Sequence, residues 1–212
     1  MVLNDKVKEQ VKEKLASLEN KVKLIVFTQE LECDYCHDTR TLAEELAGLS
    51  KMVELEVYDF QKNPAEVEQY GIDKIPAIVV EGARDYGVRF FGVPGGYEFS
   101  SLLESIRLVS TGRADIADDT RSFLDSLDEE LHLQVFVTPT CPYCPRAVVL
   151  AHNMAVASDK VRADMVEVSE FMQLAVKYQV QGVPRTVINE TIIIEGAAPE
   201  QMLIEKIKSK LQ

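Results

Sequence analysis

Tryptophan is absent from this chain of 212 residues, and an excess of basic charge is also missing. The 23 lysine and arginine residues are outnumbered by 35 aspartate and glutamate residues, which gives a formal net charge of −12. Nucleic-acid binding requires a basic surface that neutralises phosphates, so this composition argues against it. The acidic charge also disfavours binding to an anionic membrane surface, and we expect it to keep the protein soluble.

Long apolar stretches are lacking as well. The N-terminal sequence MVLNDKVKEQVKEKL has no apolar core of the kind that a signal peptide needs. The most apolar long segment, residues 147–157, contains His152 and Asn153 and falls short of the roughly 20 residues that span a bilayer. We therefore expect a cytoplasmic protein without a membrane segment. In that compartment cysteine pairs are usually reduced, catalytic or metal-bound, with hyperthermophiles as the exception.

Cysteine is scarce, and its four occurrences form two Cys-x-x-Cys motifs. "CDYC" occupies residues 33–36 and "CPYC" occupies residues 141–144, so the second motif begins 108 residues after the first (141 − 33). The other landmarks that recur at this offset are Tyr70 with Tyr178 and Ile75-Pro76 with Val183-Pro184. A repeat of this length indicates two copies of one domain rather than a solenoid. We place the copies at residues 1–112 and 113–212.

Both copies predict the same order of elements, namely helix, strand, helix at the cysteine motif, strand, helix, β-hairpin and closing helix. This order implies an α/β fold in which each unit has a central mixed four-stranded sheet flanked by helices. The expected strands are 23–27, 53–59, 77–80 and 88–91 in the first copy and 133–137, 162–168, 185–189 and 191–194 in the second. The expected later helices begin at residues 63 and 98 in the first copy and at Ser169 and Pro199 in the second.

Each cysteine motif lies where a strand passes into a helix. We expect the second helix of each copy to start at the motif, with the second cysteine one turn inside it. The start of a helix offers free N–H groups and a positive dipole end, which lower the pKa of a thiol there. Cys33 and Cys141 are therefore the predicted nucleophiles, and Cys36 and Cys144 the predicted resolving cysteines of thiol–disulfide exchange.

The X-Pro dipeptides stand at the same distance from the cysteines in both copies, 43 residues after the first cysteine (76 − 33 and 184 − 141). A cis bond before Pro76 or Pro184 would form a tight bend at the start of a strand. Such a bend offers the backbone of Ile75 or Val183 to an extended peptide, which could pair with it as an added strand. We predict that these four residues bind substrate.

With a Cys-x-x-Cys motif at a helix start and a proline before the third strand, each copy resembles a thioredoxin-fold unit. "CPYC" is similar to the motif of glutaredoxins, and two such units in one short chain resemble the tandem protein disulfide oxidoreductases, or glutaredoxin-like proteins, of thermophiles. The resemblance covers nearly the whole chain and falls on Cys33, Cys36, Pro76, Cys141, Cys144 and Pro184.

This resemblance implies reduction, oxidation or isomerisation of protein disulfides, with cis X-Pro bonds. It implies no bound cofactor besides the redox-active disulfides, and electron supply from a thioredoxin reductase-like or glutathione system. Two features depart from thioredoxins. Glu32 and Thr140 stand where thioredoxins have a tryptophan, and Phe27 and Val135 stand where thioredoxins bury an acidic residue that shuttles a proton. The sequence does not name another proton relay.

The two motifs also differ in their surroundings. The acidic residues near the first motif are Glu30, Glu32, Asp34 and Asp38. The second motif has no acidic neighbour and is followed by Arg146. Negative charge disfavours a thiolate, so we predict that Cys141 has the lower pKa and reacts faster. Tyr35 and Tyr143, inside the motifs, either contact substrate or only pack against the cysteines.

Three other functions compete with protein disulfide exchange. Four thiolates can hold structural zinc, although ribbon-type sites separate their two pairs by only about 15–20 residues. A binding module stapled by disulfides is the second alternative, although the short loops of such motifs stabilise little. The third is a glutathione-dependent glutaredoxin, because Gly95-Gly96 could begin a helix that receives a carboxylate. The same glycines also fit a simple turn between hairpin and helix.

Overall fold

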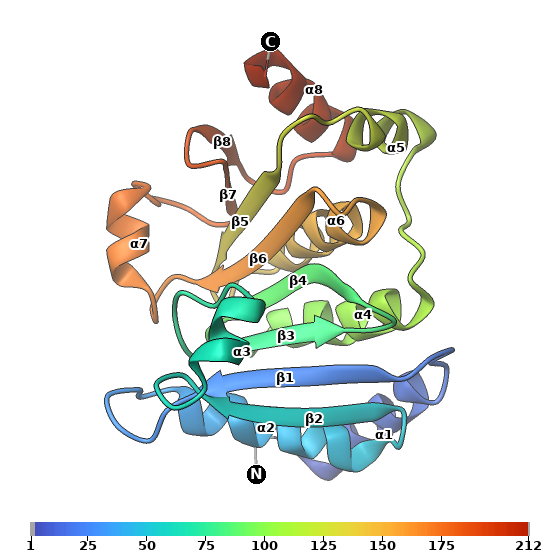
Figure 1. Ribbon diagram of the computed structural model, residues 1–212, viewed down its shortest axis with the longest axis vertical. Coiled ribbons are helices and arrows are strands. Elements are labelled where there is room, and N and C mark those ends of the chain that lie inside the picture. The colour runs from blue at the N-terminus through green and yellow to red at the C-terminus, as the bar shows by residue number, and fades with distance from the viewer. Residues whose placement is uncertain (1–2, 212) are drawn as a thin grey trace.

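Both halves of the chain fold into the predicted order of elements, as the computed structural model of residues 3–211 shows (Figure 1). The first half contains α1 (Asp5–Leu15), β1 (Val22–Thr28), α2 (Cys36–Leu49), β2 (Val53–Asp59), α3 (Pro64–Gln69), β3 (Ala77–Glu81), β4 (Asp85–Phe91) and α4 (Glu98–Thr111). The second contains α5 (Asp118–Asp125), β5 (Leu131–Val137), α6 (Cys144–Ala157), β6 (Val161–Glu167), α7 (Met172–Lys177), β7 (Arg185–Ile188), β8 (Ile192–Glu195) and α8 (Glu200–Leu211). The expected α/β fold with two thioredoxin-like units is confirmed.

Local sequence accounts for several of these boundaries. The Asn4 side chain accepts the Val7 N–H at 3.0 Å and caps α1. Pro64 occupies the first position of α3, where its missing N–H costs no hydrogen bond. Gly112 ends α4 with a φ of 61°, a left-handed conformation that glycine adopts without steric penalty. Residues 112–117 then lead to α5 without regular structure, and the division of the chain after residue 112 stays a prediction.

Three predicted helix starts were wrong. Helices α2 and α6 begin at the second cysteine of each motif rather than the first, because the intervening tyrosine is the N-cap residue. The second cysteine is thus the first helical residue and not one turn inside the helix. Helix α7 begins at Met172 rather than Ser169, because a turn intervenes in which the Glu170 N–H donates to Glu167 Oε2 at 2.8 Å.

All eight strands join in one sheet, with the order β2-β1-β3-β4-β6-β5-β7-β8. The two four-stranded halves meet where β4 and β6 pair in parallel, from Val88 opposite Ala163 to Phe91 opposite Val166. This seam was not predicted from the sequence. Strands β1, β4, β5 and β6 run in the same direction, so both cysteine motifs lie at the same edge of the sheet.

Alternating side chains cover the two faces of the sheet, as the pleat of a strand requires. In β1, Leu24 and Val26 point to the face that packs against α1, α2, α4 and α6. Ile25 and Phe27 point to the opposite face, where short α3 and α7 lie (Figure 1). Both sets are completely buried, so β1 reads as a continuous apolar run.

A buried carboxylate with its ionic partners lies on the strand pair that joins the halves. Asp164 on β6 is fully buried and lies opposite Arg89 of β4 in the parallel register. Its carboxylate accepts hydrogen bonds from His132 Nε2 at 2.6 Å and from Arg162 Nε at 3.0 Å. These partners hold the pKa of Asp164 well below its ordinary value, against the opposing effect of burial.

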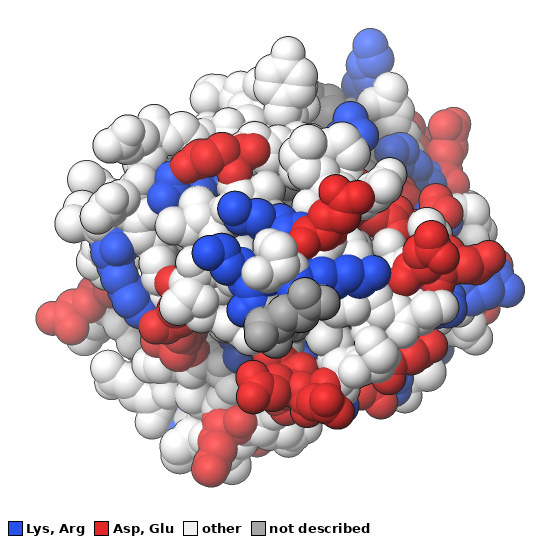
Figure 2. Space-filling model, turned by 90° about the horizontal axis from the view of Figure 1, so that it is seen from above, with Lys and Arg blue, Asp and Glu red and all other residues white. Residues whose placement is uncertain are grey.

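The surface formed at the end with α5 and α8 carries interleaved acidic and basic side chains (Figure 2). Several basic side chains gather near the centre of that face, with acidic side chains around them (Figure 2). None of the helices in residues 3–211 combines the length and apolar character needed to cross a membrane.

Candidate active sites

The four cysteines form two disulfides, Cys33–Cys36 and Cys141–Cys144. In each motif the first cysteine lies in the turn before a helix and the second is its first residue. Cys33 is half-buried, and the other three cysteines are buried. Within each motif the first cysteine is the more accessible one, as a nucleophile requires.

The C-terminal motif sits close to its X-Pro bend. Cys141 Sγ accepts the backbone N–H of Cys144 at 3.1 Å, a contact that also favours a thiolate at that sulfur. The same sulfur lies 3.7 Å from the carbonyl oxygen of Val183. Both the Ile75-Pro76 and the Val183-Pro184 bonds are cis, as the family resemblance implied. The structure therefore brings Cys141 and the predicted peptide-binding residue Val183 together.

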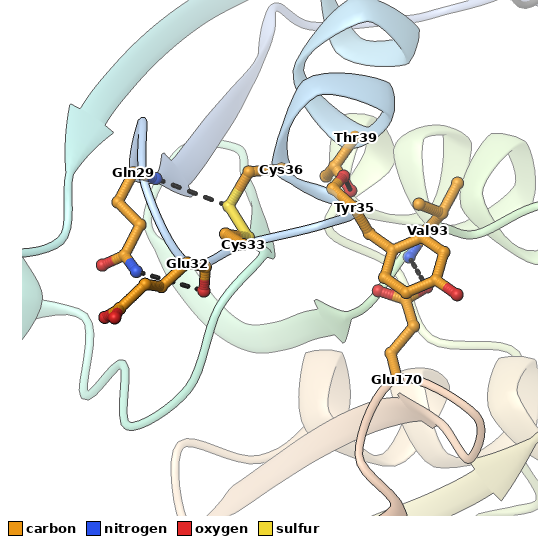
Figure 3. The surroundings of a disulfide bond; sticks show 8 residues. All are labelled: Gln29, Glu32, Cys33, Tyr35, Cys36, Thr39, Val93 and Glu170. Carbon is orange, nitrogen blue, oxygen red and sulfur yellow. Dashed lines mark hydrogen bonds between the residues drawn. A yellow bond between two sulfur atoms is a disulfide. The ribbon is translucent and has the colours of Figure 1, made fainter.

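The N-terminal motif has different neighbours (Figure 3). Cys36 Sγ accepts the backbone N–H of Gln29 at 3.4 Å. The Tyr35 side chain points away from the disulfide, toward Glu170 and Val93 (Figure 3). Glu170 belongs to the second half of the chain, so this site lies at the boundary between the two halves.

The predicted tyrosines lie at the surface. Tyr35 is 43% exposed and Tyr143 is 71% exposed, and both occupy N-cap positions without a side-chain capping bond. Packing against the cysteines therefore leaves much of both tyrosine side chains exposed to solvent. Their role in substrate contact stays a prediction, and Tyr143 is the more available of the two.

Gly95-Gly96 has a structural explanation. Gly96 has a φ of 57°, and a Cβ at this position would collide with the carbonyl group of Pro139. The next residue, Tyr97, donates its N–H to that same carbonyl at 2.9 Å. The glycines therefore let the start of α4 approach the turn that precedes Cys141, which favours the turn interpretation over a carboxylate site.

Sequence analysis did not predict Glu98, which lies two residues after Gly96. Glu98 is 1% exposed, its Oε2 accepts the Ser101 hydroxyl, and its Oε1 has no partner among the described residues. Burial raises the pKa of Glu98 to about 7, although the Ser101 hydrogen bond opposes that shift. An acidic residue directly after a glycine turn gives no sequence signal of burial.

Glu98 lies close to the turn before the C-terminal motif, because the adjacent Tyr97 donates its N–H to the Pro139 carbonyl. Helices α4 and α6 both start from the edge of the sheet that carries the motifs, and Ser105 Oγ contacts His152 Nδ1 at 2.7 Å. Two helical turns are about seven residues, so we expect Glu98 to lie near the first turn of α6, which begins at Cys144.

Comparison with known proteins agrees with this geometry. A family model described as a thioredoxin domain matches residues 20–104 and 131–209. The chain belongs to the thioredoxin domain family. Each match contains one Cys-x-x-Cys motif and one cis X-Pro bond, so this family assignment covers both halves of the chain.

Among solved structures, a protein disulfide oxidoreductase from Aeropyrum pernix is 28% identical, with a TM-score of 0.91, over 99% of this chain and 94% of that one. The alkylhydroperoxide reductase protein AhpF from Enterococcus faecalis is 26% identical, with a TM-score of 0.88, over 97% of this chain and 99% of that chain. These neighbours agree with the family assignment, and the resemblance to tandem proteins of thioredoxin fold is confirmed.

Among curated proteins, an "NADH dehydrogenase" of Bacillus subtilis is 24% identical over 211 residues. An alkyl hydroperoxide reductase protein of Staphylococcus aureus is 25% identical over 213 residues. The alignments cover 99–100% of this chain but 38% of each relative. The chain thus spans less than half the length of these relatives.

Proposed function

We propose that this thioredoxin-family protein exchanges disulfides with other proteins through both Cys-x-x-Cys sites. In the reduced protein, the Cys141 thiolate attacks a substrate disulfide, forms a mixed disulfide and releases one substrate thiol. Cys144 then attacks the Cys141 sulfur and releases the second substrate thiol. Two electrons pass from the dithiol to the substrate. The reverse sequence oxidises a substrate dithiol, and Cys33 and Cys36 have the corresponding roles in the other site.

The observation that carries this proposal is the contact between Cys141 Sγ and the carbonyl of Val183, 3.7 Å apart at the cis bend before Pro184. A peptide paired with the Val183 backbone would run directly past the nucleophilic sulfur. Such placement favours an extended protein segment as substrate and holds its disulfide in reach of the thiolate.

Insulin reduction by variants with one intact site tests this function. We expect the C33S/C36S variant, which keeps Cys141 and Cys144, and the C141S/C144S variant each to retain activity, with the former faster. Iodoacetamide should correspondingly alkylate Cys141 before Cys33 in the reduced wild-type protein. The variant lacking all four cysteines is the control. If that control is as active as the wild-type protein, the cysteines are not the reactive groups.

We further assign to Glu98 the exchange of a proton with Cys144. When Cys144 attacks the mixed disulfide it must lose its proton, and a neighbouring carboxylate with a pKa near neutrality can take it. Glu98 is ionised above its pKa of about 7 and protonated below it. The rate at the C-terminal site should therefore rise as the pH increases through 7. Because Glu98 lies on α4 of the first half, the C-terminal site would depend on a residue from the other half.

Replacing Glu98 with glutamine tests that role. In the C33S/C36S background, Glu98→Gln should slow insulin reduction at pH 7 on the order of a hundredfold and remove the rate inflection near pH 7. Glu104→Gln, on the same helix but paired with Arg107 at the surface, is the matched control and should keep the wild-type profile. An unchanged pH profile in Glu98→Gln, measured with folding verified by circular dichroism, would remove Glu98 from the mechanism.

The electron source is part of the proposal. The relatives named NADH dehydrogenase and alkyl hydroperoxide reductase contain a region like this chain within a longer protein. A thioredoxin reductase-like enzyme that draws electrons from a nicotinamide cofactor therefore fits as the reductant of this chain. We also propose a cytoplasmic location, which is supported by the restriction of cysteine to the two motifs.

A further inference from the structure

The two sites have equivalent backbone edges beside their cis prolines. Gly92, after β4, donates its N–H to the Pro76 carbonyl at 3.0 Å. Gly196, after β8, donates its N–H to the Pro184 carbonyl at 2.8 Å. An extended peptide would reach the cysteines along a groove beside the cis proline. Each glycine lies on one side of that groove, which we call its wall.

In the first half this wall is covered by the second half. A Cβ placed on Gly92 would lie 2.8 Å from Glu167 Cβ and 2.9 Å from Glu170 Cδ. Glu170 Oε1 also accepts the N–H of the next residue, Val93, at 2.7 Å, and Figure 3 shows this contact beside Tyr35. The cause is topological, because β6 pairs with β4 and its following turn lies over the end of β4.

In the second half the corresponding wall is open. Strand β8 is the last strand of the sheet, and a Cβ on Gly196 would meet no atom within 4 Å. Gly182, two residues before Pro184, is equally open. Its counterpart in the repeat is Lys74, whose side chain is only 10% exposed and lies 3.8 Å from the centre of the Phe91 ring.

Exposed apolar side chains extend the open groove. Met172 is 66% exposed and Val176 is 76% exposed on α7. They line a hollow of about 550 Å³ that reaches Gln181, beside the X-Pro bend. The matching positions of α3 are Pro64 and Glu68 (172 − 108 and 176 − 108), so this apolar surface has no equivalent in the first half.

The N-terminal site has a cavity instead of an open groove. A cavity of about 440 Å³ borders the disulfide, and its lining includes Cys33, Cys36, His37, Arg40, Lys62 and Asn63. Pockets of this size hold small molecules. Since the cysteines themselves form part of its wall, a small disulfide in the cavity would meet the sulfurs without pairing with the sheet.

We propose that the Cys33–Cys36 site favours low-molecular-weight disulfides, whereas the Cys141–Cys144 site favours extended polypeptide disulfides. This inference rests on the proposed thiol–disulfide exchange. The Cys33 thiolate attacks the small disulfide, forming a mixed disulfide and releasing one small thiol. Cys36 then attacks the Cys33 sulfur and releases the second small thiol. The protein dithiol supplies two electrons and becomes the intramolecular disulfide, so the atoms and electrons balance.

The test compares two substrates at two isolated sites. The C141S/C144S and C33S/C36S variants are reduced with dithiothreitol, freed of reductant, and mixed with hydroxyethyl disulfide or with insulin. For each variant the single-turnover rates give a ratio of small-disulfide to insulin reactivity. Intrinsic differences in thiol reactivity cancel in this ratio. We expect it to be at least about tenfold higher for the N-terminal site, because the covered groove denies a polypeptide one or two backbone hydrogen bonds.

Equal ratios, or a higher ratio at the C-terminal site, would overturn the division of substrates while leaving exchange itself established. Loss of activity at both sites toward both substrates would instead overturn the proposed function.

A second variant tests directly whether Glu170 covers the groove of the N-terminal site. In the C141S/C144S background, Glu170→Ala should raise the insulin rate several-fold and leave the hydroxyethyl disulfide rate unchanged. Glu170→Gln keeps an acceptor for Val93 and should behave as the parent; an insulin rate unaffected by Glu170→Ala would contradict the covering role.

Discussion

Substitution of Cys144 with serine, in a C33S/C36S background, is expected to trap a protein substrate covalently on Cys141. Serine cannot attack the mixed disulfide, so the first step proceeds and the second does not. Steady-state insulin reduction should fall at least about a hundredfold, because the two cysteines act as one unit. Non-reducing electrophoresis and peptide mass spectrometry should show an adduct on Cys141 that dithiothreitol releases.

The matched variant for this experiment is Cys141→Ser in the same background. It leaves Cys144, which is completely buried at the first position of α6. We expect this variant to be as inactive as the first but to form no adduct, since the remaining sulfur is shielded from substrate. An adduct that forms equally well on Cys144 would contradict the assignment of nucleophile and resolving cysteine.

Asp164→Ala should cost about 3–5 kcal/mol in the free energy of unfolding at pH 7. The fully buried carboxylate is the shared partner of His132 and Arg162, and its removal leaves the Arg162 guanidinium without that partner. Urea unfolding monitored by circular dichroism measures the change. Asp164→Asn, which keeps the side-chain shape, is the control for lost packing.

The same substitution has a defined pH dependence. The pKa of Asp164 is lowered in the folded protein, so its contribution to stability is present above the unfolded pKa of about 3.9. That contribution is lost as the pH falls below this value. The stabilities of the wild-type protein and Asp164→Ala should therefore converge in acid. A difference below about 1 kcal/mol at pH 7 would show that the buried carboxylate contributes no more to stability than an exposed ion pair does.

Local patterns predicted most of the fold of each half. The buried strands are apolar runs in the sequence. The equal spacing between each cysteine and its proline predicted the repeated unit correctly, because both residues belong to that unit. The seam escaped prediction for a physical reason. Pairing of β4 with β6 depends on which strand edge remains free after both halves have formed, and the alternation of residues 85–91 does not encode a partner 70 or more residues away.

The two residues that sequence analysis did not predict lie at the boundary between the two halves. Glu98 begins α4 and Glu170 lies in the turn before α7, two places where acidic residues are ordinarily solvated. Glu98 is buried and Glu170 is half-buried, and contacts between the halves lie beside both, namely those of Tyr97 with Pro139 and of Glu170 with Val93. The proposed proton relay of the C-terminal site and the cover over the N-terminal site therefore depend on how the two halves pack together. Motifs read within each half separately do not predict that packing.

The most direct measurement of the central claim is the electron balance between the reduced protein and an oxidised protein substrate. Reduced wild-type protein is incubated with insulin, and the reaction is stopped by alkylation and analysed by mass spectrometry. We predict that thiols disappear from the chain in pairs, as Cys33–Cys36 and Cys141–Cys144, and that the substrate gains an equal number. Insulin reduction without formation of either disulfide, or cysteines that remain reduced throughout, would contradict the account.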